Sequence, residues 1–186
     1  MTQRSEEISY DRWVWVDLEM TGLDDESCVI LQAAMIITDP HFKVLCEVDI
    51  PIWQPESALS TMIPIVKSMH TKNNLLERVR TSQYSLMQAE QELMSHLVRH
   101  VGYQKGILAG NSMYVDRRFL RRYMPSFESF LHYRQIDVSS LKLISQAWYG
   151  AKGRPPKKAN SHTALEDIRD SIEELKFYQQ NIFRHP

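Results

Sequence analysis

Short runs of β-branched, aromatic and other apolar residues recur along this chain, and each ends at a polar or glycine-containing turn. Runs of this kind, bounded by turn residues, are typical of buried strands. They lie at residues 13–17, 29–37, 44–50, 107–109 and around residue 136. The turn dipeptide Asp39-Pro40 separates the second run from the third, so these two strands are expected to pair antiparallel.

Apolar residues at helical spacing predict helices between and after these runs. From Ser85 to Val101 the apolar residues recur every three or four positions, and Ser85 with Gln88 resembles a capping box. The other segments with helical character lie at residues 61–69, 117–123, 139–148 and 163–182. Pro125 is expected to stop the helix before it, whereas residues 150–160, rich in glycine, proline and lysine, predict a flexible, irregular loop.

The order of these elements predicts an α/β fold. Three antiparallel strands come first, and strands and helices alternate after them, which indicates a sheet of mixed direction flanked by helices. The 186 residues are 43% hydrophobic and 24% charged, which fits one globular domain and excludes collagen-like and disordered classes. We therefore expect a single domain over residues 1–186, with an ordered core from about residue 10 to residue 183.

The formal net charge of -1 argues at first against a nucleic-acid partner, because such proteins are usually basic. The charges are segregated, however. Residues 117–158 carry ten Lys or Arg against two acidic residues, whereas residues 1–30 carry two basic residues against eight acidic ones. This distribution argues only against a long polynucleotide, which needs a broad basic surface, and leaves a short RNA possible.

The sequence also bears on the cellular compartment. No apolar run approaches the ~18–20 residues of a membrane span, and the polar first dozen residues do not resemble a secretory signal. Cys28 and Cys46 lie in apolar surroundings without metal-ligand spacing, so reduced thiols are expected. These features favour a cytoplasmic protein.

Acidic residues stand where an α/β sheet usually binds ligands. Asp17 and Glu19 flank Leu18 at the carboxyl end of the first strand, and strand geometry puts both carboxylates on one face. An ordinary solvated strand end is the alternative for this pair. Asp116 has the alternative of a helix N-cap, a role that Asp favours.

A histidine and a further carboxylate accompany the start of the last helix. Thr163 with Glu166 has the pattern of a capping box, which places His162 just before the cap and Asp167 in the first helical turn. The two side chains are therefore expected close together, and a simple salt bridge is the alternative to chemistry.

These residues together fit metal-dependent phosphoryl chemistry. Four carboxylates from three segments, those of Asp17, Glu19, Asp116 and Asp167, could hold two hard divalent cations such as Mg²⁺. Two metals about 3.5–4 Å apart stabilise the attacking and the leaving oxygen of an in-line displacement. His162 is the candidate general base, because an imidazole with a pKa near 6.5 can accept a proton at neutral pH.

Four motifs of the chain resemble those of the oligoribonucleases, members of an exonuclease superfamily whose site is four acidic residues and a histidine. They are Trp15-Val16-Asp17-Leu18-Glu19-Met20-Thr21-Gly22-Leu23, Gly110-Asn111-Ser112 with Asp116-Arg117-Arg118-Phe119-Leu120, His132-Tyr133-Arg134 with Asp137-Val138-Ser139, and His162-Thr163-Ala164-Leu165 with Asp167-Ile168. The resemblance implies a ribonuclease-H-like fold, a homodimer, and removal of 5′-mononucleotides from the 3′ end of short single-stranded RNA, from dinucleotides to about five residues.

The resemblance also implies a role for each site residue. Asp17, Glu19, Asp116 and Asp167 would bind two divalent cations, Mg²⁺ or Mn²⁺, and His162 would be the general base. The expected substrate-binding residues are Leu18 as a wedge between bases, His70 beside the 3′ nucleotide, Ser112, Arg134 and Ser139 on the terminal 5′ phosphate, and Tyr133 reaching the neighbouring protomer's site. Without the resemblance, Leu18 has the alternative of ordinary core, Tyr133 that of a packed ring and Arg134 that of a surface charge.

Two positions depart from the family pattern. Gln32 stands where an acidic residue is usual, and Tyr114-Val115 replaces a smaller or more polar pair before Asp116. Neither is an expected ligand, so they bear only on the surroundings of the site and on the loop that carries Asp116. Two rival functions remain: a proofreading or tRNA-trimming exonuclease of the same superfamily, and a catalytically silent nucleic-acid-binding dimer module, which the full set of catalytic residues disfavours.

Overall fold

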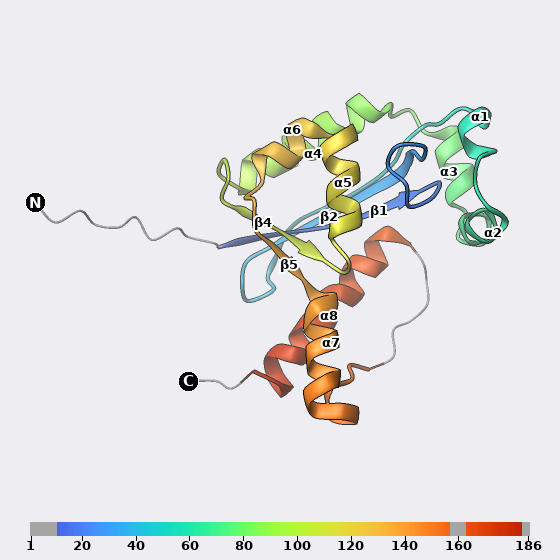
Figure 1. Cartoon of the computed structure of the whole chain (residues 1–186). Helices are drawn as coiled ribbons and strands as arrows, with labels where there is room; N and C mark the ends of the chain where they lie inside the picture. The colour runs from blue at the N-terminus through green and yellow to red at the C-terminus, as the bar shows by residue number, and fades with distance from the viewer. Residues whose placement is uncertain (1–10, 157–162, 184–186) are drawn as a thin grey trace, which may run out of the picture.

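A five-stranded mixed sheet forms the centre of the molecule, with helices on both of its faces (Figure 1). The structure is a computed structural model that describes residues 11–156 and 163–183. The strands are β1 (Arg12–Met20), β2 (Ile30–Thr38), β3 (Val44–Pro51), β4 (Gly106–Gly110) and β5 (Gln135–Asp137), in the spatial order β3-β2-β1-β4-β5. This sheet confirms the predicted α/β class and all five predicted strands.

The directions of the strands also agree with the sequence. β1, β2 and β3 pair antiparallel, whereas β4 lies parallel to β1 and β5 parallel to β4. β2 is buried along its whole length, and so is most of β1. Both strands are apolar because helices cover them on both sides, as in other buried sheets.

Helices α4, α5 and α6 cover one face of the sheet, and α7 and α8 cover the other (Figure 1). Helices α1, α2 and α3 pack at one end of the sheet, around Leu31 of β2. The helices are α1 (Glu56–Leu59), α2 (Pro64–Lys72), α3 (Leu75–Thr81), α4 (Leu86–His100), α5 (Tyr114–Tyr123), α6 (Pro125–Phe130), α7 (Val138–Tyr149) and α8 (Ala164–Asn181). No helix in the described ranges is long and apolar enough to cross a membrane.

Two of the predicted helix boundaries are correct, and the alternative considered for Asp116 is wrong. The capping box of Ser85 and Gln88 forms at the start of α4, as expected. Helix α5 ends at Tyr123, just before Pro125, as expected, and a second helix, α6, which the sequence did not predict, begins at this proline, where a missing N–H costs nothing. Asp116 is not an N-cap, because Met113 holds that position and α5 begins at Tyr114.

The start of α8 and the loop before it also differ from expectation. Thr163 is the N-cap, but its side chain makes no capping hydrogen bond. The carboxylate of Glu166 pairs instead with Arg169, which also binds Glu47 of β3. The predicted irregular loop begins with a short 3-10 helix, η1 (Gly150–Gly153), and its residues from 157 to 160 lie outside the described ranges.

Candidate active site

The alternation of side chains along β1 determines which residues reach the site. Trp15 packs in the core under α7 and α8, whereas Val16 and Leu18 pack in the core under α4, α5 and α6. Because side chains alternate between faces, Asp17 and Glu19 point to the same side as Trp15. They therefore face α8, which carries Asp167.

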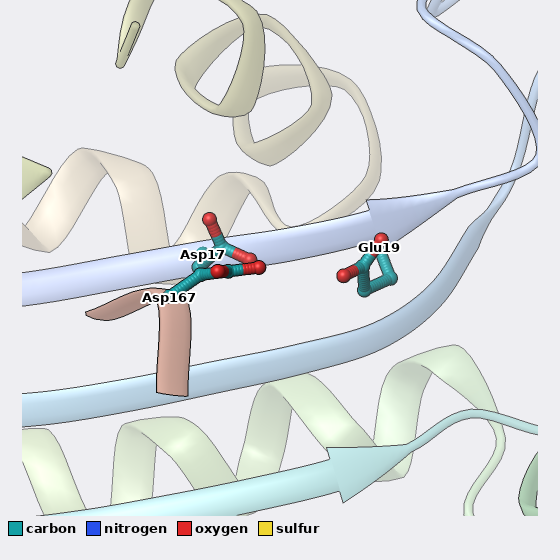
Figure 2. Close-up of side chains that lie close together, drawn as sticks. All are labelled: Asp17, Glu19 and Asp167. Carbon is teal, nitrogen blue, oxygen red and sulfur yellow. The ribbon is translucent and has the colours of Figure 1, made fainter. Parts of the chain in front are cut away.

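Three carboxylates form one cluster on this side of the sheet. Asp17, Glu19 and Asp167 each offer an oxygen, and these oxygens all lie within 4.8 Å of one another. Figure 2 shows Asp17 and Asp167 side by side, with Glu19 further along β1. The sequence prediction that these three residues share a site is thus supported by the geometry, although they come from segments about 150 residues apart.

Asp116, the fourth predicted ligand, lies on helix α5 and is hydrogen-bonded to the backbone of β1. Its Oδ1 accepts a hydrogen bond of 3.0 Å from the backbone amide of Leu18, and its side chain is 7% exposed. It does not belong to the cluster of oxygens within 4.8 Å of one another. Its negative charge nevertheless contributes to raising the pKa of Glu19.

The carboxylates carry more negative charge than their surroundings stabilise. Burial, together with the charges of Asp167 and Asp116, raises the pKa of Glu19 to about 8. Burial also raises the pKa of Asp116 to about 7, against the opposing effect of the hydrogen bond from Leu18. A divalent cation would neutralise this charge, so the donor set fits hard, oxygen-preferring metals.

His70 supports Glu19 from the adjoining helix α2. Its Nε2 donates a hydrogen bond of 3.0 Å to the carbonyl of Met20, and its Nδ1 lies 3.8 Å from Glu19 Oε2. The Nδ1 is buried and has no hydrogen-bond partner in the structure. Burial lowers the pKa of His70, so the ring is neutral and its Nδ1 is an acceptor directed toward the site.

Leu18 has the burial of a core residue. Its side chain is 5% exposed and packs in the core under α4, α5 and α6, on the face opposite to the carboxylates. Leu23, in the loop after β1, is 70% exposed. This burial fits the alternative of ordinary core for Leu18, whereas its role as a wedge between bases stays a prediction, and Leu23 is the exposed apolar side chain of this motif.

Two predicted phosphate-binding residues do come together. The hydroxyl oxygens of Ser112 and Ser139 lie 3.2 Å apart, although they follow different strands, β4 and β5. Ser112 adopts a positive φ of 55°, and Gly110 before it admits no side chain, because a Cβ there would lie 2.3 Å from Met113 Sδ. The backbone at the end of β4 is therefore tightly constrained.

Asp137 organises this loop, and the sequence reasoning did not single it out for a role. Its Oδ1 accepts hydrogen bonds from the amides of Ser112 and Ser139, each 3.0 Å long, and its Oδ2 accepts one from Met113. It thereby caps α7 and holds the turn before α5. An aspartate directly before a helix is a recognisable N-cap, but its bond to a distant turn is a tertiary feature.

Tyr133 and Arg134 stand on the surface next to β5. Tyr133 is 71% exposed, and the guanidinium of Arg134 lies over its ring at 5.4 Å from the centroid. The loop beneath them is held by Arg117 of α5, which is 6% exposed. Arg117 pairs with Glu128 and donates hydrogen bonds of 2.9 Å to the carbonyls of His132 and Tyr133.

His162, the predicted general base, lies outside the described residues. The structure places the start of α8 and Asp167 in its first turn at the carboxylate cluster. The role of His162 remains a prediction.

Comparison with known proteins agrees with this site. The family model described as exonuclease matches residues 14–175, which include all four acidic residues and His162. Solved structures with the same fold include E. coli exonuclease I with a dA16 oligonucleotide, at a TM-score of 0.69 and 13% identity over 92% of this chain. Cell-death related nuclease 4 aligns at a TM-score of 0.68, 14% identity and 92% coverage.

This chain spans 41% of the length of the exonuclease I chain and 66% of that of cell-death related nuclease 4. The likeness in fold confirms the ribonuclease-H-like architecture. The chain belongs to the exonuclease family of nucleases.

Curated relatives narrow the assignment within this family. An oligoribonuclease of Francisella tularensis subsp. tularensis is 45% identical over 94% of this chain and 97% of its own length. An oligoribonuclease of a Mycobacterium species is 42% identical over 95% of this chain and 83% of its own length. Within the exonuclease family, the chain is thus a member of the oligoribonucleases.

Proposed function

We propose that this protein removes 5′-mononucleotides from the 3′ end of short oligoribonucleotides, dinucleotides in particular. The observation that carries the proposal is the carboxylate cluster of Asp17, Glu19 and Asp167, within 4.8 Å, in a chain 45% identical to an oligoribonuclease. Asp116 accepts a hydrogen bond from the backbone of Leu18, on the strand that carries Asp17 and Glu19.

Two divalent cations, Mg²⁺ or Mn²⁺, would be held by these four carboxylates. When bound, they supply charge stabilisation for the attacking and leaving oxygens of phosphodiester hydrolysis. His162 would take the proton of the attacking water, because it precedes the helix that carries Asp167 by only a few residues. His70 would accept a hydrogen bond from a ligand hydroxyl at its buried, unpartnered Nδ1 beside Glu19.

The far end of the site would hold the 5′ phosphate of the substrate. Ser112 offers a hydroxyl next to Ser139, whose Oγ lies 3.2 Å from that of Ser112, and Arg134 supplies a guanidinium suited to bidentate phosphate binding. A site that binds the terminal phosphate at one end and cleaves at the other favours substrates of matching length. Leu23 supplies exposed apolar surface for a base.

The active form would be a homodimer in which Tyr133 reaches the site of the second copy. Tyr133 is 71% exposed, and helix α7 presents Leu143 at 69% and Trp148 at 74% exposure. Large exposed apolar side chains of this kind are typical of protein interfaces. Mass measurement in solution tests the dimer, and Trp148→Glu should yield monomers.

We place this activity in the cytoplasm. Cys28 and Cys46 are free thiols in the structure, which is the usual state in a reducing compartment.

A cleavage assay tests the proposed activity. The purified protein is incubated with a 5′-labelled diribonucleotide and with a twenty-nucleotide RNA, with Mn²⁺ and with a chelator. We expect rapid, metal-dependent cleavage of the dinucleotide. Faster cleavage of the long RNA would indicate a different exonuclease of this superfamily, and binding without metal-dependent cleavage would indicate a silent binding module.

A further inference from the structure

A continuous line of hydrogen bonds joins the two ends of the proposed site. Ser139 Oγ donates to Asn111 Oδ1 at 3.0 Å, and Asn111 Nδ2 donates to Ser171 Oγ at 2.7 Å. Ser171 Oγ in turn donates to the carbonyl of Asp167 at 2.8 Å. The line therefore runs from the serine pair after β4 and β5 to the backbone of a predicted metal ligand on α8.

The direction of every bond in this line is fixed by the available hydrogens. The single hydroxyl hydrogen of Ser171 is used on Asp167, so Ser171 can only accept from the Asn111 amide. Asn111 Oδ1 then accepts the hydroxyl hydrogen of Ser139.

Because the hydroxyl hydrogen of Ser139 is donated to Asn111, its oxygen can only accept hydrogen bonds from Ser112. It accepts the backbone amide of Ser112 at 3.0 Å, and the Ser112 hydroxyl lies within hydrogen-bond reach at 3.2 Å. The hydroxyl hydrogen of Ser112 is thus the one in the serine pair that can be donated to a phosphate. Asn111 sets this arrangement because it is the residue that accepts from Ser139.

Asn111 and Ser171 link helix α8 to the turn at Ser112. Ser171 is 5% exposed and lies one turn after Asp167 on α8, whereas Asn111 directly precedes the constrained Ser112. A partly buried polar bridge of this kind resists displacement, because breaking it leaves polar groups without their hydrogen-bond partners. The distance between α8 and the Ser112 turn is therefore fixed by side chains, independently of the sheet.

We propose that Asn111, together with Ser171, is a positioning residue that sets the separation between the phosphate-binding end and the metal-binding end of the site. This inference rests on the proposed function. A dinucleotide must touch both ends at once, so its cleavage depends on their separation. A substrate that touches only the metal end does not depend on it.

Two substrates separate these effects. One is a 5′-phosphorylated diribonucleotide, and the other is the p-nitrophenyl ester of thymidine 5′-monophosphate, whose only phosphate is the one that is cleaved. We expect Asn111→Ala and Ser171→Ala to lower the ratio of kcat/KM for the dinucleotide to that for the ester about tenfold, the effect of one lost buried hydrogen bond. The double variant should show the same ratio as either single variant, because both substitutions break one bridge.

Ser145→Ala is the matched control. Ser145 is a serine of α7 with 2% exposure whose hydroxyl donates to the carbonyl of Gly153 at 3.0 Å, away from the serine pair. This variant should lose thermal stability but keep the substrate ratio within twofold. An equal loss of kcat/KM on both substrates in the Asn111 and Ser171 variants would instead leave their substrate ratio equal to that of the Ser145 variant. That result would show a merely structural role and overturn the inference.

Measurements on the wild-type enzyme distinguish failure of the proposed function from failure of the positioning role of Asn111 and Ser171. A wild-type protein that cleaves the ester with Mn²⁺ but not the dinucleotide would refute the proposed function and the inference with it. A wild-type protein that prefers the dinucleotide, with variants that keep the wild-type ratio, would refute the inference alone.

Discussion

The backbone amide of Leu18 donates a hydrogen bond of 3.0 Å to Oδ1 of Asp116, which lies 98 residues later in the chain. Leu18 stands between Asp17 and Glu19, so this bond fixes the strand that carries two of the proposed metal ligands to the helix that carries another. Asp116 therefore has two roles: it holds the backbone of β1, and it adds negative charge to the site.

Two substitutions at this position should separate its duties. Asp116→Asn keeps an oxygen that can accept from Leu18, whereas Asp116→Ala leaves that amide without a partner. Both variants should lose metal-dependent hydrolysis, but only the alanine variant should lose about 1–3 kcal/mol of unfolding free energy, the usual effect of a buried unsatisfied group. Urea unfolding measures the difference. Equal stability of the two variants would contradict the structural duty.

The metal-free protein should become less stable as the pH rises. The pKa of Glu19 is raised to about 8 and that of Asp116 to about 7, so the folded state keeps protons that the unfolded chain releases. Stability that depends on these protons is complete at acidic pH and is lost as the pH rises through these values. Thermal unfolding with a chelator should show a lower Tm at pH 8.5 than at pH 6.

Two comparisons identify the groups responsible for this pH dependence. Glu19→Gln should flatten it, because the amide carries no charge at any pH. Mn²⁺ should raise the Tm of the wild-type protein more at pH 8.5 than at pH 6, because it competes with protons for the same carboxylates. A Tm that is independent of pH in the metal-free protein would contradict the raised pKa values.

Leu18 and Leu23 should respond in opposite ways to truncation. Leu18→Ala removes a core side chain and should lower the unfolding free energy by about 2–5 kcal/mol. Leu23→Ala changes a 70% exposed side chain, so stability should hold while dinucleotide affinity falls by about 1–3 kcal/mol if a base stacks on it. Calorimetric binding with Ca²⁺ in place of the catalytic metal measures the affinity. An unchanged affinity would exclude Leu23 from base contact.

Gln32 should not tolerate the acidic residue that is usual in the family. It is 1% exposed, lies opposite Glu19 on β2, and donates to Asp49, whose other oxygen accepts from Arg78 at 2.9 Å. Gln32→Glu places two carboxylates together and should cost about 1–3 kcal/mol at pH 8. Adding Asp49→Asn should recover most of the loss in urea unfolding. A fully stable single variant would show that the Gln32–Asp49 bond is dispensable.

The proposed base predicts a specific kinetic defect. His162→Ala should lower kcat by about 10²–10⁴-fold at neutral pH, the usual contribution of a general base, with little change in substrate affinity. Single-turnover kinetics measure the chemical step directly. His100→Ala, at the end of α4, is a control histidine on a helix that carries none of the proposed site residues. Full activity of the His162 variant would refute the assignment.

Most of the fold could be predicted because β1, β2 and β4 are largely buried and therefore carry nearly continuous apolar runs. The remaining differences arise where one local sequence pattern is compatible with two structures. Pro125 follows the end of α5, as expected, but it also begins α6, whose Phe127 packs in the core and which the sequence did not predict. Thr163 and Glu166 match a capping box, but the cationic Arg169 competes successfully for the carboxylate.

The carboxylates of the site could be predicted from the sequence, whereas the residues that hold the site in place could not. Asp17 and Glu19 are recognisable from strand periodicity, yet the same periodicity turns Leu18 into the core, which a motif alone does not reveal. The roles of Asn111 and Ser171 depend on contacts between segments 60 residues apart. No local pattern encodes such a bond.

The buried guanidinium of Arg117 has a consequence for assembly. It binds the carbonyls of His132 and Tyr133 within one chain, so the backbone beneath the exposed tyrosine is ordered when the monomer folds. The entropic cost of ordering that loop then falls on folding instead of association. A second copy of the chain would meet a preorganised arm, and only side-chain freedom would be lost when the two join.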